Sequence, residues 1–308
     1  MTGGQNGAEA RLGRREFLRR LSLAGAGTGA GLALFPGLVG APGVIRALAA
    51  PATGPVLPGS PPDKQDPRGI TVRPDDPAIS ASPVEYSGRI TPLLGYLSLP
   101  ASPEVYPGIL VLHDVPGMTE HVRDATRRLA KAGYVALAVD LLSRMGGAAK
   151  VGDAAAISTA LSTITAPQYL QDMNSSVSYL EARPLAAKSR IGVLGFGLGG
   201  SLAWLLLSQN PDLKAGVIFS GGVPSATMVP RITAAVLAIF GEAEERDTKE
   251  ISDFDAAMKK TGRAWAYKVE SKAGRGFFDD TRDRYVPDAA KDAWRLTLDW
   301  YATHLSAS

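Results

Sequence analysis

The stretch that decides the fold is Gly195-Phe196-Gly197-Leu198-Gly199-Gly200. It follows the apolar run from Ile191 to Leu194, which is short and continuous, as in a strand covered on both faces. It then leads directly into a predicted helix. A strand that enters a helix through so sharp a turn presents the residue at the apex of the turn at the edge of a sheet. That residue is Gly197, so the turn is kept while its apex has no side chain.

Apolar runs and helical patterns alternate on both sides of this turn. Two strand-like segments, 84–89 and 93–99, flank a short turn and are expected to pair antiparallel. The rest alternates strand with helix, which predicts an α/β fold with a mostly parallel central sheet and helices on both faces. We predict further strands over 109–112, 134–139, 191–194, 215–219, 234–240 and 264–269, and helices over 119–133, 167–180, 251–260 and 287–305, with one more beginning after the glycine-rich turn.

Composition excludes several classes of protein. The chain has 308 residues, 45% of them hydrophobic, and a formal net charge of +3. Residues 1–49 hold six arginines and two glutamates, so the remainder carries a net charge of −1. A nucleic-acid partner therefore has no electrostatic support. There is no cysteine, which excludes a disulfide framework, a thiolate metal site and a cysteine nucleophile.

The N-terminal residues have the layout of a bacterial twin-arginine export signal. Arg14-Arg15-Glu16-Phe17-Leu18-Arg19 precedes a mildly apolar run over 21–44 and the small-x-small pattern Ala47-Leu48-Ala49. Six of the seventeen residues from Pro51 to Pro67 are proline, which is typical of an extended linker. We expect export to the periplasm or to the outer face of the cytoplasmic membrane, with the signal either cleaved or retained as an anchor. The predicted organisation is a signal over 1–49, a linker over 50–67 and one domain over 68–308.

The body of the chain resembles a known family. His113-Asp114 followed by Gly117, then Arg-Arg-Leu-Ala at 127–130 and Ala-Gly-Tyr-Val-Ala-Leu-Ala-Val-Asp at 132–140, look like the first half of the dienelactone hydrolases, which are α/β-hydrolases. Gly-Phe-Phe-Asp-Asp-Thr-Arg at 276–282 is similar to the end of that family. The resemblance covers roughly residues 68–305 and implies an α/β-hydrolase fold.

The resemblance also implies where a catalytic triad would lie. Members of the family use a Cys or Ser nucleophile at the turn, an acid after a late strand, and a His just before the closing Gly-Phe. These positions correspond here to Gly197, Glu244 and Arg275. Glycine offers no lone pair, and arginine stays protonated above pH 12, so it cannot serve as a general base. We therefore expect a catalytically impaired relative rather than a conventional hydrolase.

Two non-catalytic roles remain open. In the first, the backbone N–H groups of Leu198 and Gly199 point outward at a helix N-terminus below Arg275, and bind a small organic anion. The ligand pocket predicted for this role comprises His113, Asp114, Leu198, Gly199, Ser220 and Arg275. In the second, Glu244 and Arg275 form an ion pair that closes the former site, with His113-Asp114 adding to the plug. The fold would then be a scaffold or accessory subunit for a partner protein or a membrane-associated complex.

Three other functions have less support in the sequence. An active ester or lactone hydrolase would need a substitute such as Ser220 as nucleophile, or a water activated by His113. The glycines of the turn also satisfy a dinucleotide-binding fingerprint, but the next strand ends in Ser220-Gly221-Gly222 and supplies no acidic residue. Three scattered histidines and no cysteine predict no metal site, and Asp279-Asp280 before Thr281 is more typical of a turn cap. We expect no cofactor.

Overall fold

The computed structural model describes residues 71–244 and 248–307. The predicted export signal and the proline-rich linker lie outside these residues. No helix of the described part is long and apolar enough to cross a bilayer. The elements are β1 (Ile79–Ser87), β2 (Pro92–Pro100), β3 (Tyr106–Leu112), α2 (Glu120–Lys131), β4 (Val135–Val139), η1 (Ser143–Met145), α3 (Ala148–Val151), α4 (Ala154–Thr163), α5 (Ala166–Glu181), β5 (Ala186–Phe196), α6 (Leu198–Gln209), β6 (Ala215–Phe219), η2 (Ala226–Arg231), β7 (Ala235–Gly241), α7 (Thr248–Lys260), β8 (Trp265–Glu270) and α8 (Pro287–His304).

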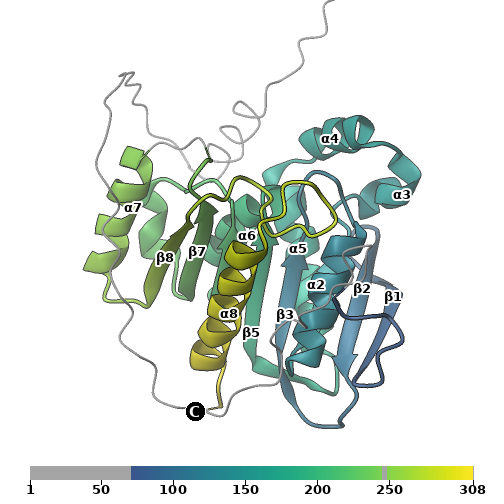
Figure 1. Ribbon diagram of the computed structural model, residues 1–308. Helices are drawn as coiled ribbons and strands as arrows, with labels where there is room; N and C mark the ends of the chain where they lie inside the picture. Colours follow the sequence, from purple (N-terminus) through teal and green to yellow (C-terminus); the bar gives the residue numbers. More distant parts are fainter. Residues whose placement is uncertain (1–70, 245–247, 308) are drawn as a thin grey trace, which may run out of the picture.

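One eight-stranded sheet runs through the molecule in the order β1-β2-β4-β3-β5-β6-β7-β8 (Figure 1). β2 pairs antiparallel with both β1 and β4, and every later pair is parallel. The predicted α/β fold with an antiparallel N-terminal pair is therefore confirmed. Since β3, β5, β6, β7 and β8 are parallel, their carboxyl ends and the loops that follow them meet at one edge of the sheet, where ligands bind in open α/β folds.

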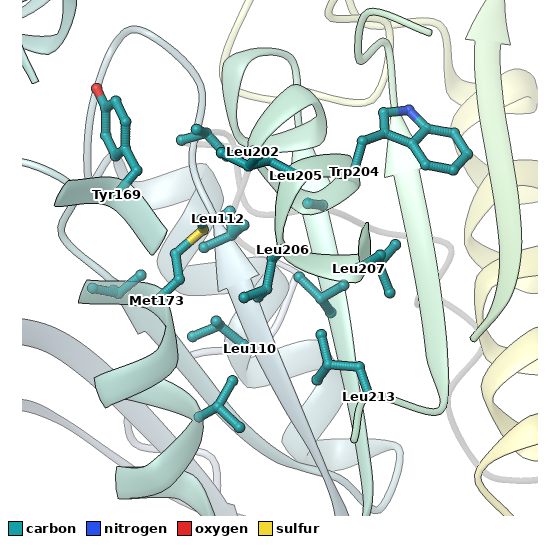
Figure 2. Packing of buried hydrophobic residues seen from close by; sticks show 14 of the residues in the cluster. Leu110, Leu112, Tyr169, Met173, Leu202, Trp204, Leu205, Leu206, Leu207 and Leu213 are labelled. Carbon is teal, nitrogen blue, oxygen red and sulfur yellow. The ribbon is translucent and has the colours of Figure 1, made fainter. Parts of the chain in front are cut away.

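Helices cover both faces of the sheet (Figure 1). α2 and α8 pack on one face, where the core includes Ile109, Val217 and Trp294. α5, α6 and α7 pack on the other face, where leucines of α6 interdigitate with Leu110 and Leu112 of β3 and with Met173 of α5 (Figure 2). Strands buried on both faces read as continuous apolar runs, and this explains why the central strands could be predicted without any alternation.

The sequence predicted no element between β4 and α5, and this segment forms the 3-10 helix η1 and the two short helices α3 and α4. Asp153 precedes α4, and its side chain accepts a hydrogen bond from the backbone N–H of Ala156. Ile157 and Leu161, one helical turn apart, are buried. A good N-cap followed by an i, i+4 apolar pair is a helix signal that the sequence contained. Thr119 precedes α2 at its N-cap position, but its side chain makes no capping hydrogen bond.

α2 is fastened to neighbouring segments by a buried ionic cluster. Asp124 is fully buried and accepts hydrogen bonds from the backbone N–H groups of Thr71 (3.1 Å) and Val72 (2.7 Å) and from Arg128 Nε (2.6 Å). Arg128 also contacts Asp280 in the loop after β8. Buried charges persist only when paired and hydrogen-bonded in this way. The cluster therefore holds the start of α2 against the β8 to α8 loop, next to the carboxyl edge of the sheet.

Candidate functional site

β5 runs into α6 through a single residue, Gly197, which has φ 54° and ψ −107°. Its N–H donates to the carbonyl of Phe219 (2.8 Å), which ties the turn to β6. A positive φ with this ψ is strained for residues that carry a Cβ, and glycine adopts it freely. The sharp turn of an α/β-hydrolase elbow is thus present in full, while its apex offers no nucleophile.

The space above that apex holds the carboxylate of Asp114, from the loop after β3. An ideal Cβ built on Gly197 would lie 2.2 Å from both Cγ and Oδ2 of Asp114. Asp114 Oδ1 accepts a hydrogen bond from the backbone N–H of Leu198 (2.8 Å), the first residue of α6. A carboxylate at a helix N-terminus is favoured by the free N–H groups and by the helix dipole. The N–H expected to point at an external anion is therefore occupied by the chain's own carboxylate.

Arg275, in the loop after β8, completes this arrangement. Its Nη2 lies 3.6 Å from Asp114 Oδ2, and both side chains are about one-third exposed. The expected ion pair of Arg275 with Glu244 is wrong for the described residues, because Arg275 contacts Asp114 instead. The reason is spatial: with no side chain at Gly197, Asp114 moves into the opening and brings its negative charge to the guanidinium. The carboxylate that faces Arg275 is therefore Asp114.

Glu244 has a different partner. Ser220, at the end of β6, donates its hydroxyl to Glu244 Oε1 (2.6 Å), and the N–H of Gly241 donates to the same oxygen (2.7 Å). Ser220 is 7% exposed and has φ 53°, a left-handed backbone conformation that is uncommon for a residue other than glycine. Among the described residues, Ser220 is therefore the best candidate for a substitute nucleophile, because its hydroxyl is hydrogen-bonded to a carboxylate in a strained turn.

His113 does not line the pocket, contrary to the prediction. It is fully buried, its Nε2 accepts the N–H of Leu141 (3.0 Å), and its Nδ1 therefore carries the proton that it donates to the carbonyl of Asp114 (2.8 Å). Burial acts to raise the pKa of the neighbouring Asp140, but hydrogen bonds from the backbone N–H groups of Ala148 (2.8 Å) and Leu142 (3.0 Å) help to lower that pKa below its usual value. With both ring nitrogens engaged in holding loops, His113 cannot activate a water.

A cavity of about 1090 Å³ opens beside the elbow. Of the six predicted pocket residues, Asp114, Leu198, Ser220 and Arg275 line it, whereas His113 and Gly199 do not. Gly199 is turned toward β3, since an ideal Cβ on it would lie 2.1 Å from the carbonyl oxygen of Leu112. The remaining walls come from α4, from the start of α2, from the aromatic residues around the elbow and from the loop after β8. They include Ser158, Thr159, Phe196, Phe219, His121, Arg282 and Arg284.

The α4 wall was missed from the sequence, because nothing in residues 154–163 carries a chemical motif. The helix becomes part of the site only when it lies across the carboxyl edge of the sheet. The sequence also did not predict that His121 and Asp279 lie close together. Both residues line the cavity.

Comparison with known proteins agrees with this architecture. The family model described as "Dienelactone hydrolase family" matches residues 93–305, which is more than half of the chain. The chain belongs to the dienelactone hydrolase family. It is 30% identical over 243 residues to "Putative carboxymethylenebutenolidase" of Methylorubrum extorquens, a match that covers 75% of this chain and 84% of that protein. A protein of the same name from Salmonella typhimurium is 32% identical over 248 residues, covering 74% and 89%.

Solved structures of dienelactone hydrolases have the same fold. "Putative Dienelactone Hydrolase" from Klebsiella pneumoniae superposes with a TM-score of 0.66 at 25% identity, covering 73% of this chain and 99% of that one. A dienelactone hydrolase-like promiscuous phosphotriesterase from metagenomic libraries gives the same TM-score at 23% identity, covering 74% and 100%. The matched part of the chain thus spans nearly the whole of these structures. Fold and ancestry are established, and function has to be argued from the site.

Proposed function

We propose that this protein is an exported member of the dienelactone hydrolase family that binds a small organic anion in the cavity without cleaving it. The absence of cleavage is argued from the Asp114 carboxylate above Gly197, held by the N–H of Leu198 and faced by Arg275, and the binding of an anion from the three arginines that line the cavity. Hydrolysis at the elbow would need a nucleophile there and donors free to stabilise an oxyanion. The first is absent, and the N–H of Leu198 already binds an internal anion.

The cavity walls suit an organic anion. Phe196 and Phe219 supply aromatic surface, while Arg275, Arg282 and Arg284 line the same cavity with guanidinium groups. Arginine binds carboxylates in a planar, bidentate manner. The relative from Bradyrhizobium is named "Probable 2-oxo-3-(5-oxofuran-2-ylidene)propanoate lactonase", and a propanoate is an organic anion of this class. An apolar cavity with a few convergent charged groups is the usual form of a small-molecule site.

The proposal is tested by titration calorimetry of the purified protein with a panel of aromatic and unsaturated carboxylates. We expect saturable binding to the wild type, and a loss of affinity of about tenfold or more in Arg275→Gln. Arg89→Gln is the matched control, because Arg89 is an exposed arginine on the turn between β1 and β2, outside the cavity wall. Equal affinities in all three proteins, or no binding of any carboxylate, would overturn the proposal and favour an accessory or scaffold protein. Pull-down experiments on exported material would then have to identify its partner.

A second candidate function is ester or lactone hydrolysis with Ser220 as nucleophile. It is favoured by one observation, the 2.6 Å hydrogen bond from Ser220 to Glu244 at the cavity wall. Hydrolysis of an ester and lactone panel decides between the two functions. We expect the wild type to hydrolyse these substrates only at background rates. A wild-type rate far above the residual rate that an oxyanion hole provides, together with its loss in Ser220→Ala, would replace the binding proposal with this one.

A further inference from the structure

Three side chains from distant parts of the chain meet on the wall of the cavity. His121 lies in the first turn of α2, and Asp279 and Asp280 lie in the loop after β8. His121 Nδ1 is 3.7 Å from Asp279 Oδ1 and 3.6 Å from Asp280 Oδ1. His121 and Asp279 line the cavity, so the three atoms lie between the buried ionic cluster of α2 and the open space of the site.

Two of these atoms are buried without a hydrogen bond. The His121 side chain is 6% exposed and that of Asp280 is 0% exposed, and neither His121 Nδ1 nor Asp280 Oδ1 has a hydrogen-bond partner among the described residues. Their separation of 3.6 Å is too long for a hydrogen bond between them. Buried polar atoms are almost always paired, so these two unpaired atoms beside the Asp279 carboxylate point to a ligand-binding position.

The carboxylates are oriented by guanidinium groups on their far sides. Arg128 contacts Asp280 Oδ2, and Arg282 Nε lies 3.1 Å from Asp279 Oδ2. In both carboxylates the Oδ1 atom is thereby turned toward His121. Asp279 Oδ1 also accepts from the backbone N–H (3.1 Å) and the hydroxyl (2.5 Å) of Thr281, which is the turn cap expected from the sequence. Outer partners that fix carboxylates in this manner are characteristic of metal sites.

We propose that His121, Asp279 and Asp280 bind a divalent transition-metal cation of the zinc type. Two donors bound at about 2.0 to 2.2 Å in tetrahedral geometry lie roughly 3.3 to 3.6 Å apart. The distances from His121 Nδ1 to the two carboxylates, 3.7 Å and 3.6 Å, are close to this range, and the ligand atoms of all three residues lie within 4.8 Å of one another. One imidazole nitrogen with two carboxylate oxygens is a donor set for zinc and its neighbours, whereas magnesium and calcium prefer oxygen alone. The fourth position faces the cavity, where a water or an anionic ligand would complete the shell.

The two halves of this site are 158 residues apart along the chain and share no ligand spacing, which is why the sequence predicted no metal. The proposal does not depend on which anion the cavity binds.

The test uses the untagged full chain, stripped with EDTA and desalted, in a calorimetric titration with ZnCl₂. We expect one equivalent of Zn²⁺ to bind, and affinity to fall by about 100-fold or more in His121→Gln and in Asp279→Asn. His304→Gln is the matched control, because His304 lies at the end of α8, outside the cavity wall, and should leave binding unchanged. Thermal melts followed by circular dichroism in the absence of metal check that each variant is folded. In Asp279→Asn the side-chain carbonyl can still accept the hydrogen bonds from Thr281.

Loading with Co²⁺ gives an independent readout. A visible absorption band that appears at one equivalent in the wild type and in His304→Gln, and is lost in His121→Gln and Asp279→Asn, would support the site. Absence of saturable Zn²⁺ binding, or equal binding in folded His121→Gln and Asp279→Asn, would overturn the proposal. His121 would then be only a neighbour of the two carboxylates in the ionic cluster.

Discussion

The position that a Cβ would take on Gly197 lies 2.2 Å from Cγ of Asp114. The two residues come from different loops and compete for one space, so a side chain at the apex and the carboxylate above it exclude each other. This relationship explains why restoring a nucleophile at the elbow is not a simple reversal: a serine at 197 would have to displace Asp114 from the N–H of Leu198.

Gly197→Ala should lower the free energy of unfolding by more than backbone strain alone explains. We expect a loss of about 3 kcal/mol, of which about 1 kcal/mol comes from the positive φ and the rest from displacing a hydrogen-bonded carboxylate. Gly262→Ala is the control, because Gly262 has φ 67° and an added Cβ there meets nothing within 4 Å. Urea denaturation of both variants measures the difference, and equal losses would show that Asp114 yields freely.

Ser220 should tolerate glycine better than alanine. Ser220→Ala removes the hydrogen bond to Glu244 and keeps a Cβ at φ 53°, so we expect it to cost about 1 kcal/mol. Ser220→Gly loses the same bond but relieves the strained backbone, so its stability should lie close to that of the wild type. Lys272→Gly, at an exposed residue with φ 58°, reports the strain term by itself and should stabilise the protein. Thermal melts rank the three, and a Ser220→Gly variant less stable than Ser220→Ala would contradict this account.

Glu270 at the end of β8 should make stability depend on pH. Burial, followed by the negative charge of Asp292, raises its pKa to about 7, and its Oε1 is buried without a hydrogen-bond partner among the described residues. A carboxyl with a raised pKa stabilises the fold fully only below its unfolded pKa near 4.5, and this contribution is lost as the pH rises through about 7. We therefore expect Glu270→Gln to be more stable than the wild type at pH 8, by about 1 kcal/mol, and to show little advantage at pH 4.

Denaturation of both proteins across this pH range provides the measurement. Glu85→Gln is a matched control, since Glu85 is exposed on β1 and should give no such pH-dependent difference. A Glu270→Gln variant whose advantage is the same at pH 4 and pH 8 would show that ionisation of Glu270 does not oppose folding.

Much of the fold was predictable because its signals are local. Continuous apolar runs such as 109–112 and 215–219 are strands in the structure, and the helix that begins after Gly197 follows directly from the turn. α4 was missed because only Ile157 and Leu161 mark its buried side, and two apolar residues in a largely small and polar segment make a weak pattern.

The resemblance predicts that Gly197, Glu244 and Arg275 occupy the triad positions, since they keep the order of the family's motifs. Their partners could not be predicted in this way. The sequence suggested that Glu244 would pair with Arg275, but Glu244 bonds Ser220 and Arg275 faces Asp114. Which carboxylate reaches which cation depends on how the loops after β3, β6, β7 and β8 cross at the edge of the sheet.

By itself the sequence determined the α/β fold, the family and the glycine at the apex of the turn, because each of these depends on residue identity and on local periodicity. Only the tertiary structure decided what occupies the empty apex and that His121 meets Asp279 and Asp280. These contacts join residues 83 to 159 positions apart, and no local propensity encodes them. They exist because parallel strands bring their carboxyl-end loops to one edge, where removal of a single side chain leaves room for another.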